Sequence, residues 1–242
     1  MSFDRRIYNF AAGPATLPEE VLQQTADELL NWHGLGTSVM EISHRSKEFM
    51  AVYEETLADL RELMSIPDDY EILLLQGGGI GQNAAIPMNL MPLARKPKAD
   101  FIVTGIWSEK SVKEAQKYGE AHVAATSLND HFRSIPERST WQLSKDAAYV
   151  HICANETIGG VEFAHFPDVG AAPLVADISS NILSKKMDVR QCGVLFAGAQ
   201  KNIGPAGVTI VIVRKDLIGH AMAITPSIWD WAKEVANQSM FN

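Results

Sequence analysis

The chain has 242 residues, of which 46% are hydrophobic and 21% are charged, as in an ordinary globular protein with a sizeable core. Its formal net charge of −8 argues against a nucleic-acid-binding protein, which would carry a basic face. No run approaches the roughly 20 apolar residues of a membrane span, and the N-terminus has no apolar signal core, so we expect a cytoplasmic protein with no membrane partner.

The first third of the sequence predicts an irregular arm followed by two helices. Residues 1–16 form the expected arm, and residues 17–242 form one large domain. The first helix is predicted from Pro18 to about Trp32, because a proline and two glutamates suit a first helical turn. The second is predicted from Ser46, a suitable N-cap, to Met64, since its apolar residues recur every three or four positions.

From residue 71 onward, strand and helix patterns alternate. Apolar, β-branched runs predict strands at residues 71–76, 100–105, 122–127, 147–154, 173–177, 194–198 and 208–213. Helical patterns follow the first two of these strands, up to about Met91 and over residues 108–119 with Ser108 as N-cap. This alternation predicts an α/β fold with a mostly parallel, seven-stranded sheet and helices on both faces. The last two strands have no helix between them and are expected to pair antiparallel.

Lys201 lies in the turn between the last two strands, within the stretch LFAGAQKNIGPAG. Most loop lysines are solvated surface charges. Small neighbours, however, allow a lysine to be held in a pocket, where partial desolvation favours the neutral amine. A neutral amine condenses with carbonyl groups, including that of pyridoxal 5′-phosphate (PLP). This interpretation requires partner residues elsewhere in the chain.

Suitable partners follow other predicted strands, at the sheet edge where α/β proteins bind ligands. Gly77–Gly79 could hold a phosphate at a helix N-terminus, although a plain tight turn is the alternative. Trp107, if it is not a core residue, could stack on an aromatic ring. Asp177 could pair with a pyridine nitrogen and Thr157 could contact the ring edge, although turn and capping roles suit both. Together with Lys201, these residues supply what PLP requires.

Other site types are less well supported by the sequence. The stretch GIGQNA matches a loose dinucleotide pattern, but Asp100 begins a strand instead of ending one, so a dehydrogenase is a distant alternative. The histidines lack metal-ligand spacing, and no metal site is expected. Cys153 and Cys192 are isolated and are expected to be buried thiols in a reducing compartment.

Six segments of the chain resemble the phosphoserine aminotransferase family of fold-type I PLP enzymes: NFAAGPATLP, GTSVMEISHRSKEF, LQGGGIGQNAAIPMN, CANETIGG, VADISSNILS and FAGAQKNIGPAG. The likeness covers essentially the whole chain, and QKNIGPAG is its most specific part. It implies that residues 17–242 are the large PLP-binding domain. The implied reaction interconverts O-phospho-L-serine and 2-oxoglutarate with 3-phosphohydroxypyruvate and L-glutamate, in the biosynthesis of serine, with pyridoxine biosynthesis as a second pathway to test.

The resemblance also implies roles for single residues around the cofactor ring. Lys201 would carry PLP and move the proton during transamination, while Asp177 would pair with the pyridine nitrogen. Trp107 would stack on the ring, and Thr157 would contact its edge. Three residues would hold the phosphate group: Gly79, Ile80 and Gln200.

Substrate and subunit contacts follow from the same resemblance. Arg45, beside His44, would bind a substrate carboxylate, because arginine presents a bidentate fork. Asn242 would reach the phosphate in the neighbouring subunit of a homodimer whose cofactor site is shared.

The chain departs from the family in three ways. Family members often carry arginine at the position of Ile80 and serine at the position of Ala12. They also continue into a smaller C-terminal domain that helps to recognise the substrate, so we expect this chain to bind PLP but to discriminate substrates poorly. Two alternatives stay open: a catalytically silent PLP-binding fragment, and another fold-type I enzyme such as a desulfurase.

Overall fold

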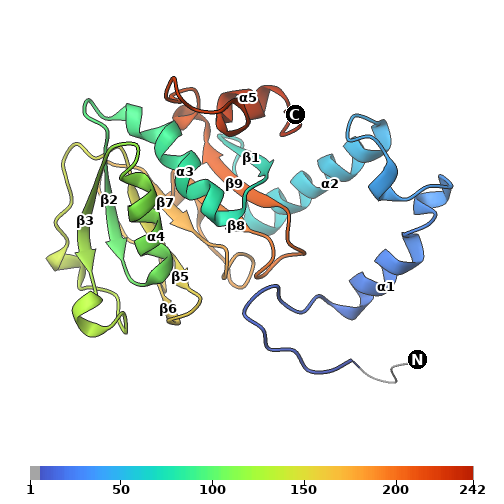
Figure 1. Cartoon of the computed structure of the whole chain (residues 1–242), viewed down its shortest axis with the longest axis horizontal. Coiled ribbons are helices and arrows are strands. Elements are labelled where there is room, and N and C mark those ends of the chain that lie inside the picture. Colours follow the sequence, from blue (N-terminus) through green and yellow to red (C-terminus); the bar gives the residue numbers. More distant parts are fainter. Residues whose placement is uncertain (1–5, 242) are drawn as a thin grey trace.

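The protein is described here by a computed structural model, which covers residues 6–241 and contains a seven-stranded sheet with a long N-terminal extension (Figure 1). The sheet strands are β1 (Tyr70–Leu75), β2 (Lys98–Val103), β3 (Glu120–Thr126), β4 (Val150–Cys153), β7 (Leu174–Asp177), β8 (Val194–Gly198) and β9 (Thr209–Arg214). A separate hairpin pairs β5 (Asn155–Glu156) with β6 (Val161–Glu162). The α-helices are α1 (Glu19–Glu28), α2 (Lys47–Met64), α3 (Gly78–Leu90), α4 (Ile106–Ala115) and α5 (Trp231–Ala236).

The sheet has the order β1-β9-β8-β7-β4-β2-β3. Strands β3, β2, β4, β7 and β8 run parallel, whereas β9 is antiparallel to both β8 and β1. The predicted mostly parallel α/β sheet and the antiparallel pairing of its last two strands are therefore confirmed. Because β1 runs in the same direction as β8, the carboxyl ends of β1, β2, β7 and β8 all face the same edge of the sheet.

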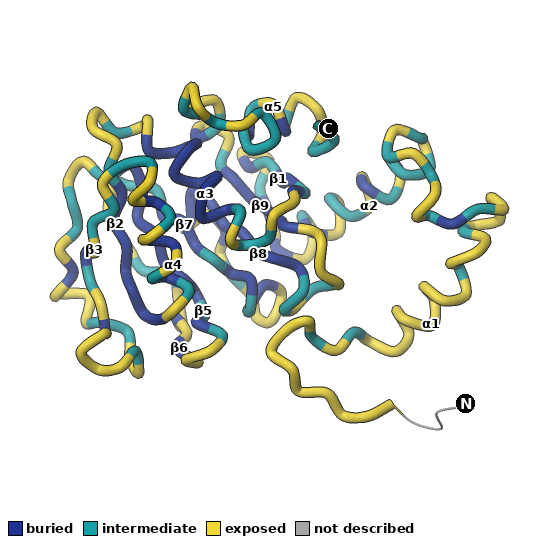
Figure 2. Tube along the Cα trace, viewed as in Figure 1, coloured by how far each residue is buried: buried dark blue, intermediate teal, exposed yellow. Residues whose placement is uncertain are grey.

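The central strands are apolar on both faces because both faces are covered. One face packs under α3, α4 and α5 through residues such as Leu90, Val112 and Trp231. The opposite face packs against the C-terminal half of α2, through Leu60 and Met64, and against irregular segments between residues 135 and 192. Figure 2 shows the buried residues concentrated in the strands and in α3.

The N-terminal part lies away from this core. None of the ten residues of α1 is buried (Figure 2), and residues 6–18 before it contain no helix or strand. Ala15 nevertheless donates its backbone N–H to the carbonyl of Gln200 at 2.9 Å. A methyl group on Gly13 would lie 3.3 Å from Cγ of Lys201. The arm therefore touches the turn that carries Lys201, and its residues 1–5 lie outside the described part of the chain.

Several predicted boundaries need correction. The first helix ends at Glu28 instead of near Trp32, because the chain turns at Asn31, which has a non-helical φ of −151° and whose side chain accepts the N–H of Gly36 at 2.6 Å. The second was predicted well, and the hydroxyl of Ser46 accepts the N–H of Phe49 at 3.2 Å. The predicted strand 147–154 shortens to β4, and the following turn forms the unexpected β5–β6 hairpin.

Candidate functional site

A cavity of about 280 Å³ opens at the carboxyl edge of the sheet. It collects residues that follow β1, β2, β7 and β8, as the parallel arrangement predicted. Its lining comprises Gly77, Gly78, Gly79, Ile80, Asn83, Trp107, Asp177, Ser179, Gln200 and Lys201. Eight of the residues singled out from the sequence, from four separate segments, therefore share one cavity.

Lys201 lies at the centre of this group. Its Nζ is 4.5 Å from the centroid of the Trp107 ring and donates a hydrogen bond to the hydroxyl of Thr157. Lys110 reaches the same ring, with its Nζ 4.4 Å from the centroid. The Trp107 Nε1 is buried and has no hydrogen-bond partner among residues 6–241. The amine, the aromatic face and the hydroxyl are thus all within reach of one small molecule.

Asp177 is the last residue of β7, and among residues 6–241 only one oxygen of its carboxylate has a hydrogen-bond partner. Its Oδ1 accepts the N–H of Ser179 at 2.9 Å and the hydroxyl of Ser179 at 2.6 Å. That hydroxyl in turn accepts the N–H of Gly198 on the neighbouring strand at 3.0 Å. Burial raises the pKa of the Asp177 carboxyl above its ordinary value, although the Ser179 hydrogen bonds and nearby Lys201 oppose this shift.

The N-terminus of α3 forms the opposite wall of the cavity. Gly77, its N-cap, has a φ of 94°, a left-handed conformation that favours glycine. A methyl group on Gly79 would lie 3.6 Å from Ser179 Oγ and 3.9 Å from Asp177 Oδ2, so the position of a side chain at residue 79 faces these two residues. Because the N-cap is a glycine, no N-cap side chain accepts the N–H groups in the first turn of this helix. Its first turn can therefore bind an anion.

The N-terminus of α4 is closed, and the predicted N-cap there is wrong. The helix begins at Ile106, so Trp107 and Ser108 are its second and third residues, and Ser108 is not the cap. The buried carboxylate of Glu156 accepts the N–H groups of Trp107 at 3.0 Å and Ser108 at 2.9 Å. A residue 48 positions away along the chain therefore supplies the cap that a local pattern could not reveal.

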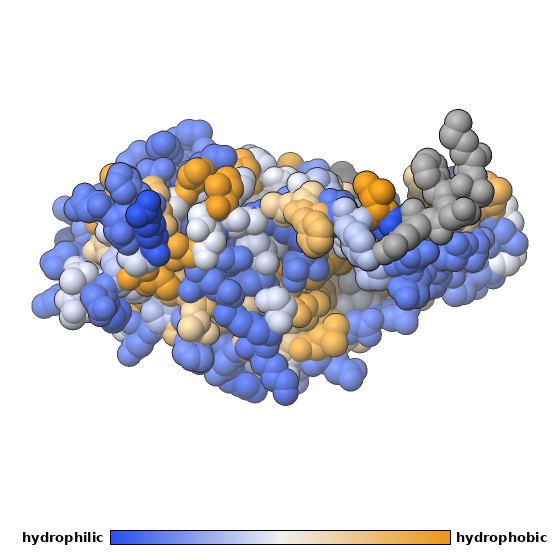
Figure 3. Space-filling model, turned by 90° about the horizontal axis from the view of Figure 1, so that it is seen from below, coloured by the Kyte–Doolittle hydropathy of each residue, from blue (hydrophilic) through white to orange (hydrophobic). Residues whose placement is uncertain are grey.

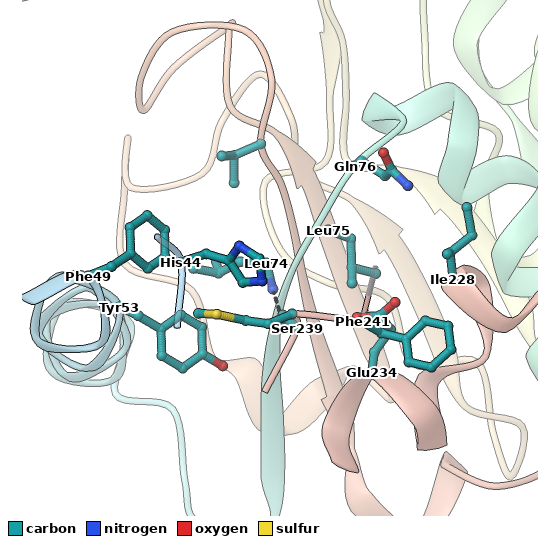
Figure 4. Close-up of a pocket in the computed structure, with 12 residues that line it drawn as sticks. His44, Phe49, Tyr53, Leu74, Leu75, Gln76, Ile228, Glu234, Ser239 and Phe241 are labelled. Carbon is teal, nitrogen blue, oxygen red and sulfur yellow. Dashed lines mark hydrogen bonds between the residues drawn. The ribbon is translucent and has the colours of Figure 1, made fainter. Parts of the chain in front are cut away.

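His44 and Arg45 lie outside the lining of the Lys201 cavity. His44 lines a neighbouring cavity of about 390 Å³ between α2, β1 and the C-terminal segment (Figure 4). Arg45 is exposed, and its Nε donates to Nε2 of His44 at 3.2 Å. Gln76 lines this second cavity while Gly77 lines the first, so the two cavities adjoin at that turn. Asn242 lies outside the described residues.

Sequence reasoning missed three residues of this region. Ser179 carries a detectable signal, because a serine two positions after a strand-end aspartate often binds its carboxylate. Asn83, one turn into α3, lines the cavity and accepts the hydroxyl of Ser111 at 3.0 Å. Glu156 carries no local signal, since its partners are on another strand–helix unit.

Other site types find no support within residues 6–241. No group of three or more His, Cys, Asp or Glu side chains is arranged to hold a metal ion in this part of the chain. No described helix is both long and apolar enough to cross a membrane. Cys153 and Cys192 are buried free thiols, as predicted. Asp100 binds His122 and Ser144 at the start of β2, away from the Lys201 cavity.

Comparisons with known proteins agree with this geometry. The family described as aminotransferase class-V matches residues 7–230. A phosphoserine aminotransferase of Paraburkholderia phytofirmans is 59% identical over 98% of this chain and 66% of its own length. The solved phosphoserine aminotransferase of Bacillus circulans subsp. alkalophilus superposes with a TM-score of 0.94 at 44% identity, over 98% of this chain and 65% of that one.

A solved PLP-bound phosphoserine aminotransferase from Trichomonas vaginalis superposes with a TM-score of 0.91 at 41% identity, over 98% of this chain and 66% of that one. The chain therefore spans slightly less than two thirds of the length of the relatives that it matches.

Proposed function

Because the chain belongs to the class-V aminotransferase family, we propose that it binds PLP in the Lys201 cavity and serves the phosphoserine aminotransferase reaction. The substrates would be O-phospho-L-serine and 2-oxoglutarate, and the products 3-phosphohydroxypyruvate and L-glutamate. The names of the relatives support this choice of reaction. The observation that carries it is the convergence of Lys201, Trp107 and Asp177 on one cavity.

The donor set of the cavity fits PLP. A phosphate group requires N–H donors, which the uncapped first turn of α3 offers at Gly79 and Ile80. A protonated pyridine nitrogen requires a carboxylate, which Asp177 offers with one oxygen held by Ser179. A flat ring requires an aromatic platform, which Trp107 offers. Each part of the cofactor thus has a counterpart of matching chemistry.

When bound, PLP supplies an aldehyde that condenses with amines and a ring that withdraws electrons from the substrate Cα. The chain supplies positions and protons. Lys201 Nζ would be the amine for cofactor attachment and the base that moves the proton at the substrate Cα. Thr157 orients this Nζ through its hydroxyl oxygen. Asp177 stabilises positive charge at the ring nitrogen, which in turn offsets the unfavourable burial of the carboxylate.

The remaining roles concern the anionic groups. Gly79, Ile80 and Gln200 would hold the phosphate of PLP at the N-terminus of α3. His44 and Arg45 would receive a substrate carboxylate from outside the Lys201 cavity. A contribution of Asn242 to a neighbouring subunit's phosphate is a further proposal.

Reduction with borohydride tests the attachment site. The 242-residue chain is saturated with PLP, reduced and digested, and the peptide carrying the pyridoxyl group is identified by mass spectrometry. We expect the label on Lys201, and no stable label in Lys201→Arg. The exposed Lys186→Arg variant, matched in chemistry, should label like the unchanged chain. Labelling of a different lysine, or of none, overturns the proposed cofactor site.

Turnover tests the reaction class separately. Glutamate formation from 2-oxoglutarate is followed with O-phospho-L-serine, L-serine, L-aspartate and L-cysteine as amino donors. The proposed function requires O-phospho-L-serine to be the best donor by kcat/KM. A labelled but inactive chain would identify it as a cofactor-binding part of the enzyme, and a preference for L-cysteine would favour a desulfurase-type activity.

We also propose that the protein acts as a homodimer in the cytoplasm, in serine biosynthesis, with pyridoxine biosynthesis as a second pathway to examine. Ile7 and Phe10 of the arm are 87% and 93% exposed. Other large apolar side chains are also exposed, most of them to a smaller extent. Figure 3 shows apolar patches scattered over one hydrophilic face of the molecule. A second copy of the chain would cover such side chains. Sedimentation should show a dimer that Phe10→Ser weakens, whereas a concentration-independent monomer would contradict the proposal.

A further inference from the structure

Glu156 connects two elements of the Lys201 cavity without lining it. The residue ends β5 and is 1% exposed. Its Oε2 accepts the N–H of Trp107 at 3.0 Å, and its Oε1 accepts the N–H and hydroxyl of Ser108 at 2.9 and 2.6 Å. Both oxygens of a buried carboxylate are thus directed at the first turn of α4, where a negative charge is favoured by the helix dipole.

The chain leaves room for this carboxylate at Gly105. A methyl group added there would lie 2.5 Å from Cδ and 2.6 Å from Oε2 of Glu156, closer than real contacts allow. The φ of Gly105 is 171°, an extended conformation open to any residue. Space for Glu156, and not backbone conformation, therefore requires glycine at this position.

Glu156 is linked to two residues that both contact Lys201. It holds Trp107 through the backbone N–H, and the Trp107 ring centroid is 4.5 Å from Lys201 Nζ. It directly precedes Thr157, whose hydroxyl accepts a hydrogen bond from the same Nζ. One carboxylate therefore links the aromatic platform on α4 to the hydroxyl beyond β5.

We propose that Glu156 is a positioning residue for PLP: it sets the separation between the Trp107 ring and the Thr157 hydroxyl, and thereby the place of the cofactor ring over Lys201. The inference rests on the proposed function, because it assumes that PLP binds in this cavity. Shifts of about 1 Å at a reacting group are enough to lower turnover about 100-fold. Loss of Glu156 should therefore affect cofactor binding and kcat more than KM for the amino donor.

The test compares Glu156→Gln with Glu162→Gln. Both glutamates belong to the β5–β6 hairpin, but Glu162 is exposed and pairs with Lys185 at 2.6 Å. PLP is titrated into the 242-residue chain, and both the dissociation constant and the quenching of tryptophan fluorescence are recorded. Trp107→Phe defines the share of quenching that belongs to Trp107. We expect about tenfold weaker PLP binding and a loss of the Trp107 share in Glu156→Gln, and no change in Glu162→Gln.

Gly105→Ala provides an independent route to the same displacement, because its methyl group would expel the Glu156 carboxylate. It should reproduce the effects of Glu156→Gln, and the double variant should be no weaker in PLP binding than the weaker single variant. Unchanged affinity and quenching in a folded Glu156→Gln chain overturn the inference and leave the proposed function standing. If neither variant folds, Glu156 has a structural role and the inference fails. If the unchanged chain binds no PLP, both are overturned.

Discussion

Two helices begin at the same edge of the sheet, and their N-termini are used in different ways. The first turn of α4 donates its N–H groups to Glu156, a carboxylate of the protein itself. The helix α3 follows Gly77, its N-cap, and begins with Gly78 and Gly79. Because glycine has no side chain, the N-cap accepts none of the N–H groups in the first turn of α3. The two helices differ little in length, with 13 residues in α3 and 10 in α4, so their dipoles are similar.

The difference shows what selects a binding site among equivalent helix ends. Every α-helix offers unpaired N–H groups at its N-terminus. In α4 an internal anion satisfies them, and the helix serves to place the Trp107 ring. In α3 glycines keep the end open, so that a phosphate can approach the backbone. Within residues 6–241, the anion site is therefore the helix end whose N–H groups are not accepted by an internal carboxylate.

The largest effect on PLP binding is expected when a carboxylate is added at the N-terminus of α3, as Glu156 provides one at the N-terminus of α4. Gly79→Asp would place a carboxylate at the second position of α3, where it can accept the free N–H groups and repel phosphate. Losing two charge-assisted hydrogen bonds, at roughly 1.5–3 kcal/mol each, weakens PLP binding about 1000-fold. Equilibrium titration with PLP measures this change. Gly79→Ala is the control, because its methyl group would make only ordinary contacts of 3.6–3.9 Å; equal weakening in both variants would contradict an open anion site.

His151 lies in β4, against which α4 packs, and its burial predicts a pH dependence of stability. Its ring packs 5.4 Å from that of Phe101 and 6.1 Å from that of Phe196, and neither nitrogen has a partner among residues 6–241. Burial lowers the pKa of His151 to about 3 from 6.5, so below pH 6.5 the unfolded chain takes up a proton that the folded chain does not. Stability is therefore lost as the pH falls from 6.5 toward 3, by about 2 kcal/mol at pH 5.

Urea unfolding between about pH 8 and pH 4 measures this loss. His151→Leu should remove that part of the pH dependence, while His165→Gln, at an exposed position, should keep it. A pH dependence that is the same in His151→Leu and in the unchanged chain would show that the buried histidine is not its source.

Positive charge added at the N-terminus of α3 should strengthen PLP binding. Ile80 is 55% exposed and lines the Lys201 cavity. Ile80→Arg would add a cation beside the expected phosphate and should strengthen PLP binding about tenfold at low salt, with the gain shrinking as salt is raised. Titrations at two salt concentrations measure it. Ile80→Gln, which adds length without charge, should bind PLP like the unchanged chain, and an equal gain in both variants would exclude an electrostatic cause.

The smallest effect is expected in the stability of the cofactor-free chain. Because burial raises the pKa of Asp177, its ionised form is disfavoured in the folded state, and this unfavourable contribution is present above the unfolded pKa near 3.8. Asp177→Asn keeps an acceptor for Ser179 but removes the charge. It should raise the free energy of unfolding at pH 7 by up to about 1 kcal/mol, with the gain shrinking as the pH falls toward 3.8.

The same variant should bind PLP poorly, which separates a functional from a structural role. Denaturant unfolding at pH 7 and pH 3.5, together with PLP titration, completes the test. A less stable Asp177→Asn chain would show that the carboxylate serves the fold and not the cofactor.

Local sequence patterns were enough to predict the sheet and the edge of it at which the cavity lies. Buried parallel strands read as apolar runs, and their carboxyl ends must share an edge, so Lys201, Asp177 and Trp107 could be placed together from local patterns. The helix from Ser46 was equally predictable, because its cap and its apolar stripe are both local in sequence.

Which helix end is open depends on contacts that form only in the folded chain. The boundary of α4 was mispredicted at Ser108 because its cap, Glu156, comes from a hairpin formed far along the chain. The positions of His44 and Arg45 beside a second cavity depend likewise on how α2 packs against β1 and the C-terminal segment. A local pattern reports a helix and its period, whereas the occupation of its N-terminus depends on contacts between residues distant in sequence, which exist only once the chain is folded.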